Sequence, residues 1–313
     1  MGKLIGLIAA LLLVLTGARG TLAQETTPRA GAGATFADTL GLPELAITAP
    51  GKGFDGVPDT TAAGRYVVTF TNTAPDEIDL NFMQLPDGVT VADLAEPPPG
   101  AGGTPVAGGA EEDQAPEWFY HTYIAGGVSV QAGQTGQAIV DLKLGTSATW
   151  AGDPSVPLTP VELTVTGDMP ADVAEPAADV TINEVGTADG FAFRLDGALA
   201  AGQQTVRVYN HSDQPHFVFL VKAPGPITEE QVQALVTFDP SSGTPLPAGT
   251  PKQEDFVPIS SLSTMSTMSI GATAWFATNL EPGYYVMLCF VGDPDHGGMP
   301  HAAEGMAQIV EVK

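Results

Sequence analysis

The chain has 313 residues, with 36 acidic and 11 basic side chains, a net charge of −25 and a single cysteine. This acidity excludes nucleic acid and anionic membrane surfaces as partners. One cysteine excludes an intrachain disulfide framework and a zinc site built on cysteine pairs. The 37 glycines and 27 prolines predict short strands separated by many turns.

Residues 1–23 have the pattern of a secretory signal peptide. Lys3 precedes an apolar run, Leu4–Leu15, and small residues precede a cleavage position after Ala23. No later segment reaches the ~20 apolar residues that a membrane-spanning helix needs. We therefore predict an exported chain, periplasmic or extracellular, without a transmembrane segment, in which residues 24–40 form a flexible lead.

The chain repeats itself at a constant offset of 138 residues. Three pairs of positions keep this register: Ala62–Asn72 with Ala200–Asn210, Gly133 with Gly271, and Gly145 with Gly283. A fixed period held over such a length indicates a tandem duplication of one structural unit.

Each copy has the pattern of an all-β unit. Short runs rich in Val, Phe and Tyr alternate with turn residues, which predicts two tandem Greek-key β-sandwiches. Short helical loop insertions are predicted at Thr90–Glu96 and Thr228–Leu235, with Thr228 as a cap. The predicted domains are 41–168 and 180–313, joined by a linker at 169–179.

The only cysteine lies in the segment "LCFVGDPDHGGMPHAAEGM", Leu288–Met306. In an exported protein, an unpaired cysteine is buried, waits for another chain, or binds a metal. With His216, far upstream, this segment completes the order His, Cys, His, Met along the chain: His216, Cys289, His301 and Met306. Two imidazoles and a thiolate, with a weaker thioether, are the donors of a mononuclear blue-copper site.

The second copy resembles the cupredoxins, the plastocyanin-like blue copper proteins. The resemblance rests on three segments: "NHSDQPH" (Asn210–His216), "GYYVMLC" (Gly283–Cys289) and "PHAAEGM" (Pro300–Met306). It implies one type 1 copper and one-electron transfer with an extracytoplasmic redox partner, which for so acidic a chain would be basic. It also implies the ligands His216, Cys289, His301 and Met306. By repetition, it extends to the fold of the first copy.

The chain departs from compact cupredoxins in one respect. Eleven residues separate Cys289 from His301, so this loop must bulge outward to return the imidazole to the sulfur. His296, inside the loop, is a rival ligand, and whether His296 or His301 closes the site is left open. Met299 competes weakly with the expected axial ligand, and His211 is expected to be exposed.

The first copy lacks the metal-binding residues. At the same offset, Ile78 replaces His216 and Ala151 replaces Cys289. We therefore expect the first copy to have no metal site and to be structural or partner-binding. Its one histidine, His121, lies among aromatic residues and is expected to contribute to packing or to an interface.

The sequence also led to the prediction that the chain is not an enzyme. The five histidines include no His-x-His pair, as multicopper oxidases need, and Leu288 replaces the histidine that precedes the ligand cysteine in copper nitrite reductases. No nucleophile elbow or P-loop is present. The predicted function is electron transfer. The alternatives are a metal-free secreted binding or adhesion module, and a copper storage or delivery protein using the methionines of Ser263–Ser269.

Overall fold

The computed structural model describes residue 36 and residues 41–95, 115–151, 158–187, 190–238, 245–263 and 268–313. Nearly all regular structure in these ranges is β-strand, so the predicted all-β fold is confirmed. The signal peptide, most of the predicted lead and the loop at 96–114 lie outside the described residues. None of the helices in the described ranges has the length and apolar character that crossing a membrane requires.

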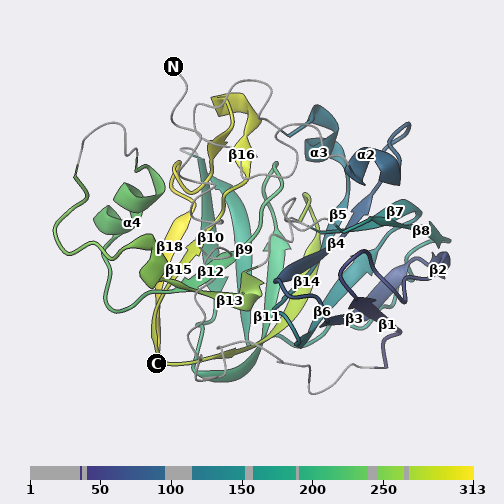
Figure 1. Cartoon of the computed structure of the whole chain (residues 1–313), viewed down its shortest axis with the longest axis horizontal. Helices are drawn as coiled ribbons and strands as arrows, with labels where there is room; N and C mark the ends of the chain where they lie inside the picture. Colours follow the sequence, from purple (N-terminus) through teal and green to yellow (C-terminus); the bar gives the residue numbers. More distant parts are fainter. Residues whose placement is uncertain are drawn as a thin grey trace.

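One seven-stranded sheet joins the two halves of the chain (Figure 1). Its strands are, in spatial order, β1 (Glu44–Ala49), β3 (Gly64–Asn72), β6 (Thr135–Leu142), β14 (Thr273–Leu280), β11 (Gly202–Asn210), β9 (Val180–Thr187) and β10 (Gly190–Asp196). The halves meet where β6 pairs antiparallel with β14, with Ala138 opposite Phe276.

The strand bounds follow the repeat that the sequence shows. β3 and β11 differ by 138 residues at both ends, and so do β6 and β14. Phe276 lies 138 residues after its partner Ala138, so the two paired residues occupy equivalent positions in the two copies. The register is therefore the one that a local two-fold axis through this pair requires, as in the isologous interface of a homodimer.

A second sheet completes the sandwich of each half. The sheet of the first half contains β2 (Thr60–Ala62), β8 (Val161–Thr166), β7 (Gly145–Ala151), β4 (Ile78–Gln84) and β5 (Ile124–Val130). The sheet of the second half contains β13 (Val257–Ser263), β12 (Phe219–Lys222), β15 (Gly283–Leu288) and β18 (Ala307–Val312). A small hairpin, β16 (Gly292–Asp293) with β17 (Met299–Pro300), follows β15.

Both predicted helices are present, as α2 (Val91–Ala95) and α4 (Glu229–Val236). At the start of α4, Thr228 Oγ1 accepts a hydrogen bond from the Gln231 N–H, and the Gln231 side chain accepts one from the Thr228 N–H. This reciprocal capping box satisfies two backbone donors that a helix start leaves free. The pattern did not predict the other short helices, α3 (Glu117–His121), η2 (Gln253–Asp255) and η3 (Pro294–His296).

Strand β5 is buried along its whole length because it lies between the two halves. Ala125 forms a β-bridge with Met268 of the second half. The next residue, Gly126, has a φ of 88°, and a Cβ there would lie 3.1 Å from Met268 Cγ. Only glycine combines this left-handed backbone with so close an approach. The contact fixes the segment that precedes β14 against the first half.

Trp275 lies on the outer face of the central sheet, at the junction of the two halves. It is fully buried and packs against Val67 and Ile139. The Arg65 guanidinium lies 4.3 Å from the centre of the Trp275 ring and donates a hydrogen bond to the Ala174 carbonyl. Arg207 forms an ion pair of 2.7 Å with Glu175. The predicted linker is thus tied to strands of both halves, while the exact domain boundaries stay a prediction.

Replacing Trp275 by alanine should lower the free energy of unfolding by ~3–5 kcal/mol, because it empties a large buried volume at the junction. Trp275→Phe should cost much less, since the phenyl ring fills most of that volume and removes an indole N–H that has no hydrogen-bond partner in the described residues. Urea unfolding followed by circular dichroism measures both variants. Equal losses for Ala and Phe would contradict a packing role.

Candidate metal centre

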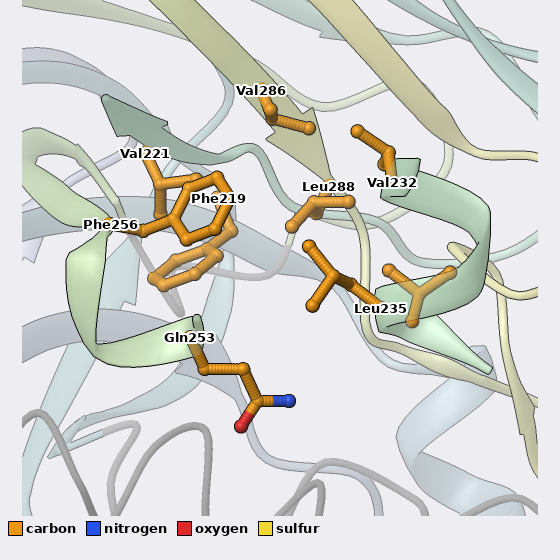
Figure 2. A pocket seen from close by; sticks show the side chains of 9 residues that line it. Phe219, Val221, Val232, Leu235, Gln253, Phe256, Val286 and Leu288 are labelled. Atoms are coloured by element: carbon orange, nitrogen blue, oxygen red, sulfur yellow. The ribbon is translucent and has the colours of Figure 1, made fainter. Parts of the chain in front are cut away.

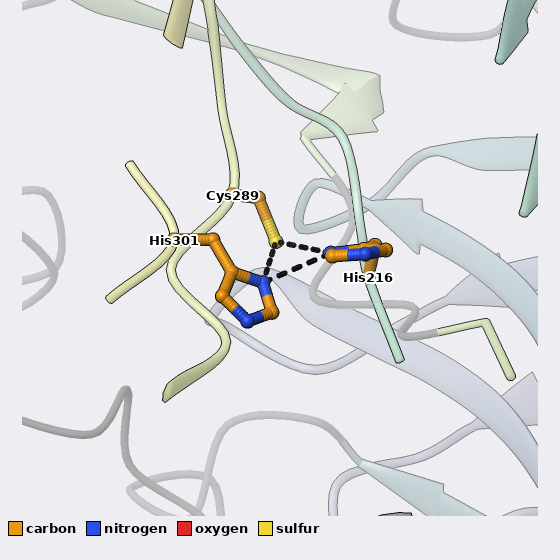
Figure 3. Close-up of side chains that lie close together, drawn as sticks. All are labelled: His216, Cys289 and His301. Carbon is orange, nitrogen blue, oxygen red and sulfur yellow. Dashed lines mark hydrogen bonds between the residues drawn. The ribbon is translucent and has the colours of Figure 1, made fainter. Parts of the chain in front are cut away.

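The structure brings His216, Cys289 and His301 together at one end of the second sandwich (Figure 3). Cys289 Sγ lies 3.6 Å from the Nδ1 atoms of both histidines, and the two Nδ1 atoms are 2.9 Å apart. All three side chains are fully buried. The loop between Cys289 and His301 does return the distal imidazole to the sulfur, as the sequence analysis required.

His216 is positioned by a turn that follows β11. Asn210 Nδ2 donates to the carbonyls of Gln214 and Met268, at 2.8 and 2.9 Å, and Asn210 Oδ1 accepts from the Ser212 N–H. The backbones of His216 and Met268 exchange two further hydrogen bonds. Because Met268 also contacts β5, the first half of the chain helps to hold His216 in place.

Cys289 and His301 are positioned by backbone hydrogen bonds across the ends of the loop. The Ala302 N–H donates to the Cys289 carbonyl at 2.7 Å, and the His301 N–H donates to the Val291 carbonyl at 2.9 Å. Tyr120 of α3 donates from its hydroxyl to the Gly292 carbonyl at 3.0 Å. An aromatic residue next to His121 therefore packs against the loop that covers the site.

Hydrogen bonds at the outer nitrogens determine the tautomer of both imidazoles. His216 Nε2 lies 2.6 Å from Ser212 Oγ, whose own hydrogen points to the Gln214 carbonyl. His301 Nε2 lies 3.0 Å from Gln214 Oε1, and the amide nitrogen of Gln214 donates to Asp293. Both Nε2 atoms must therefore donate, and both Nδ1 atoms present lone pairs to the sulfur.

Burial keeps the imidazoles uncharged. It lowers the pKa of His301 to about 3. It also lowers the pKa of His216 well below its ordinary value, and the neighbouring His301 lowers that pKa further. Phe191 covers both rings, with centroid distances of 4.8 and 4.3 Å. Neutral imidazoles in a dry pocket are free to act as metal ligands at physiological pH.

Burial also raises the pKa of the Cys289 thiol, although N–H groups of Phe217 and Val291 hydrogen-bond the sulfur and oppose this effect. The thiol is therefore protonated when no cation is near. Those N–H groups would stabilise a thiolate once a metal displaces the proton.

The other candidate residues lie outside the cluster. Met306 is fully buried beside it, and its N–H donates to the His301 carbonyl at 2.8 Å. The His296 side chain is 61% exposed and pairs with acidic groups of the loop. His211 is exposed, as expected, and Met299 is 38% exposed.

A buried carboxyl group that the sequence pattern did not predict lies near the sulfur. Glu184 of β9 is fully buried, and neither of its carboxyl oxygens has a hydrogen-bond partner in the described residues. Burial raises its pKa to about 8, and its charge contributes to the raised pKa of Cys289. Alternate residues of β9 are buried, and Glu184 lies at one of these positions. An acidic residue at an inward-facing position of a strand was the sequence signal that could have revealed it.

An apolar pocket lies between α4 and the sheet of the second half (Figure 2). It is lined by Phe219, Val221, Val232, Leu235, Val236, Gln253, Phe256, Val286 and Leu288. Leu288 directly precedes Cys289, and successive residues in an extended chain point to opposite sides. The pocket lining contains no titratable side chain, so the chemistry of this region lies at the His–Cys–His cluster.

No protein-family model and no curated protein matches the sequence. Among solved structures, an auracyanin from Roseiflexus castenholzii is 23% identical, covering 44% of this chain and 99% of that chain with a TM-score of 0.26. A copper nitrite reductase from Nitrosomonas europaea is 12% identical (86% and 93% covered, TM-score 0.23). A multicopper oxidase is 13% identical (91% and 98% covered, TM-score 0.23). These likenesses concern the fold alone.

The comparisons contradict one prediction, that the chain is not an enzyme. Solved structures that match across most of the chain include ones named as a copper nitrite reductase, as multicopper oxidases and as a laccase. The lack of His-x-His pairs and the leucine before Cys289 exclude only particular catalytic designs, whereas the prediction extended this to all catalysis. That extension was wrong. The resemblance stated from the motifs is confirmed at the level of the fold, which is cupredoxin-like.

The buried Glu184 should make the metal-free protein less stable as the pH rises. Its pKa rises from 4.5 in the unfolded chain to about 8 in the folded state, so the folded protein keeps a proton that the unfolded chain releases. Stability present below pH 4.5 is therefore lost towards pH 8, by roughly 3–5 kcal/mol at about 1.4 kcal/mol per pKa unit.

Urea unfolding between pH 4.5 and 8.5 measures this loss, and Glu184→Gln should remove most of it. The matched control, Glu311→Gln at an exposed position of β18, should leave the pH profile unchanged. A profile that Glu184→Gln does not flatten would show that this carboxyl group ionises freely in the folded protein.

Proposed function

We propose that the chain is an exported copper protein in which His216, Cys289 and His301 bind one type 1 copper ion. Met306 would be the weaker axial ligand, and the centre would exchange single electrons with a redox partner. The observation that supports this most strongly is the convergence of one sulfur and two unprotonated nitrogens within 3.6 Å.

This convergence is unfavourable without a cation. Both Nδ1 atoms present lone pairs because both Nε2 atoms donate hydrogen bonds. The thiol of Cys289 has one hydrogen, so it can satisfy only one of the two nitrogens. Buried acceptors that lack a donor destabilise a fold. A soft cation bound by all three atoms removes this conflict, and thiolate with imidazole is a donor set that copper prefers.

The surroundings suit electron transfer. The hydrogen bonds of Ser212 and Gln214 hold the imidazoles by their outer nitrogens, and Phe191 covers both rings. Ligands that are fixed in a dry cavity move little when the charge of the centre changes. When bound, copper supplies the one-electron couple between Cu(I) and Cu(II). The residues around it exclude water and keep the donor positions constant.

Two further features extend the proposal. The leader-like pattern of residues 1–23 supports export, and the net charge of −25 favours a basic redox partner. The alternative of a metal-free binding module requires Cys289 to lie away from the histidines, whereas it lies 3.6 Å from both. A storage site at Ser263–Ser269 needs exposed methionines, whereas Met268 is buried; Met265 lies outside the described residues.

Substituting Cys289 by serine should abolish the intense visible absorption that the wild type is expected to show after loading with Cu(II). The band requires a thiolate bound to copper, which a hydroxyl group cannot replace. His211→Ala, which removes an exposed imidazole from the neighbouring turn, should leave the band intact. If the wild type shows no such band after loading, the electron-transfer proposal is lost.

Substituting Met306 by leucine should keep the visible band but raise the reduction potential. Loss of an axial thioether destabilises Cu(II) more than Cu(I), because the oxidised ion gains more from a further donor. Voltammetry of the copper-loaded protein measures the shift. Met83→Leu, at an equally buried methionine of the first half, is the matched control and should leave the potential unchanged. Equal potentials for wild type and Met306→Leu would remove Met306 from the ligand set.

A further inference from the structure

A second group of metal-ligating side chains lies on the outer side of the loop. Asp293 ends β16, His296 ends η3, and Glu304 follows in the last turn before β18. His296 Nδ1 lies 3.1 Å from Asp293 Oδ2 and also contacts Glu304 Oε1. The ligand atoms of Asp293, His301 and Glu304 lie within 4.8 Å of one another.

Glu304 is incompletely satisfied in this group. Its side chain is nine-tenths buried, and its Oε2 atom has no hydrogen-bond partner in the described residues. Burial raises its pKa, and His296 opposes this effect. The negative charge of Asp293 and a hydrogen bond with that carboxyl group add to the rise. The Asp293 side chain is only 5% exposed. The single Nδ1 hydrogen of His296 faces two carboxylates, so acceptors outnumber donors at this point.

We propose that Asp293, His296 and Glu304 bind a divalent transition-metal ion of the zinc type, at a site that adjoins the His–Cys–His cluster but shares no ligand with it. One imidazole and two carboxylates are ligands that zinc accepts. With bonds of about 2.0–2.2 Å, neighbouring ligand atoms lie roughly 3–3.5 Å apart in a tetrahedral site, and the 3.1 Å contact fits this range. The exposed side of His296 leaves room for a water ligand.

The turn geometry supports this arrangement. Gly297 and Gly298 have φ values of 69° and 79°, in the left-handed region that glycine adopts readily. They reverse the chain directly after His296, and the Gly298 N–H donates to the Asp293 carbonyl at 2.7 Å. Asp293 Oδ1 also accepts from the Asp295 N–H. Two of the three ligands are thus held by one compact hairpin.

The outer site is connected to the buried cluster by two hydrogen bonds. Asp293 Oδ1 accepts from the Gln214 amide at 3.0 Å, and Gln214 Oε1 accepts from His301 Nε2 at 3.0 Å. A cation on Asp293 withdraws electron density along this path, so the Nδ1 atom of His301 becomes a weaker electron-pair donor to a bound metal ion. If the proposed copper function holds, an ion at the outer site therefore raises the reduction potential of the buried centre.

A protonated His296 between two carboxylates would produce the same contacts without a metal, so the test must separate a proton from an ion. Calorimetric titration of metal-free protein with zinc chloride at pH 7.5, in the Cys289→Ser background, removes the buried thiolate from competition. We expect one zinc ion per chain. Glu304→Gln should weaken binding at least tenfold, and His296→Ala, at a side chain 61% exposed, should do the same without disturbing the fold.

The matched control is Asp295→Asn, which removes a charge from the same loop but no ligand, and which should change the affinity less than twofold. Absence of zinc binding to the Cys289→Ser protein would overturn the proposal in favour of the protonated ion pair. So would Glu304→Gln and His296→Ala variants that bind zinc as tightly as the Cys289→Ser parent. Because this titration uses the Cys289→Ser protein, its result does not depend on whether the buried cluster binds copper.

A second measurement tests the connection to the buried centre. One equivalent of zinc added to copper-loaded wild type should raise the reduction potential, and Glu304→Gln should abolish this shift. A potential that zinc leaves unchanged, in protein that binds it, would overturn the connection through Gln214 and leave two independent sites.

Discussion

The pairing of β6 with β14 is the constraint on which the arrangement of the molecule depends. It joins the sheets of the two halves into one, with a register that a two-fold axis through Ala138 and Phe276 requires. Once that register is set, β5 lies against Met268, and Met268 is bonded through its backbone to His216. The first half therefore stabilises the site of the second half, although none of the three clustered side chains comes from it.

The comparison of the two halves shows how little separates a structural turn from one that carries a candidate ligand. Asn72 and Asn210 occupy equivalent positions, and each donates from its side chain to two carbonyls across the same kind of turn. In the first half the position corresponding to His216 is Ile78, which is fully buried in the core. The same turn scaffold thus positions the candidate ligand His216 in one half and an apolar side chain, Ile78, in the other.

The loop between Cys289 and His301 has two faces with different electrostatics. On the inner face, neutral imidazoles meet a protonated thiol in a dry cavity, and lone pairs converge. On the outer face, burial raises the pKa of Asp293, but hydrogen bonds from Gln214 and Asp295 outweigh it and keep the carboxylate ionised. Gln214 lies between them and accepts from one face while donating to the other. The length of the loop is what allows both groups to exist.

The sequence by itself determined the strands, the repeat and the identity of the four candidate ligands. Period-two patterns, a constant offset and short motifs are local properties, and the 138-residue spacing reappears in the bounds of β3 and β11. Even the cap of α4 at Thr228 depends only on residues three positions apart. Enzyme function could not be excluded in this way, because missing motifs rule out particular designs and not a class of activity.

Only the tertiary structure decided which histidine approaches the sulfur, and why. His296 and His301 both follow Cys289 within twelve residues, and their placement depends on the reversal at Gly297 and on hydrogen bonds to Val291. The burial of Glu184 and the β6–β14 register likewise depend on contacts between segments far apart in the chain. Such contacts leave no local pattern, because the free energy that selects them comes from packing and desolvation of the assembled sandwich.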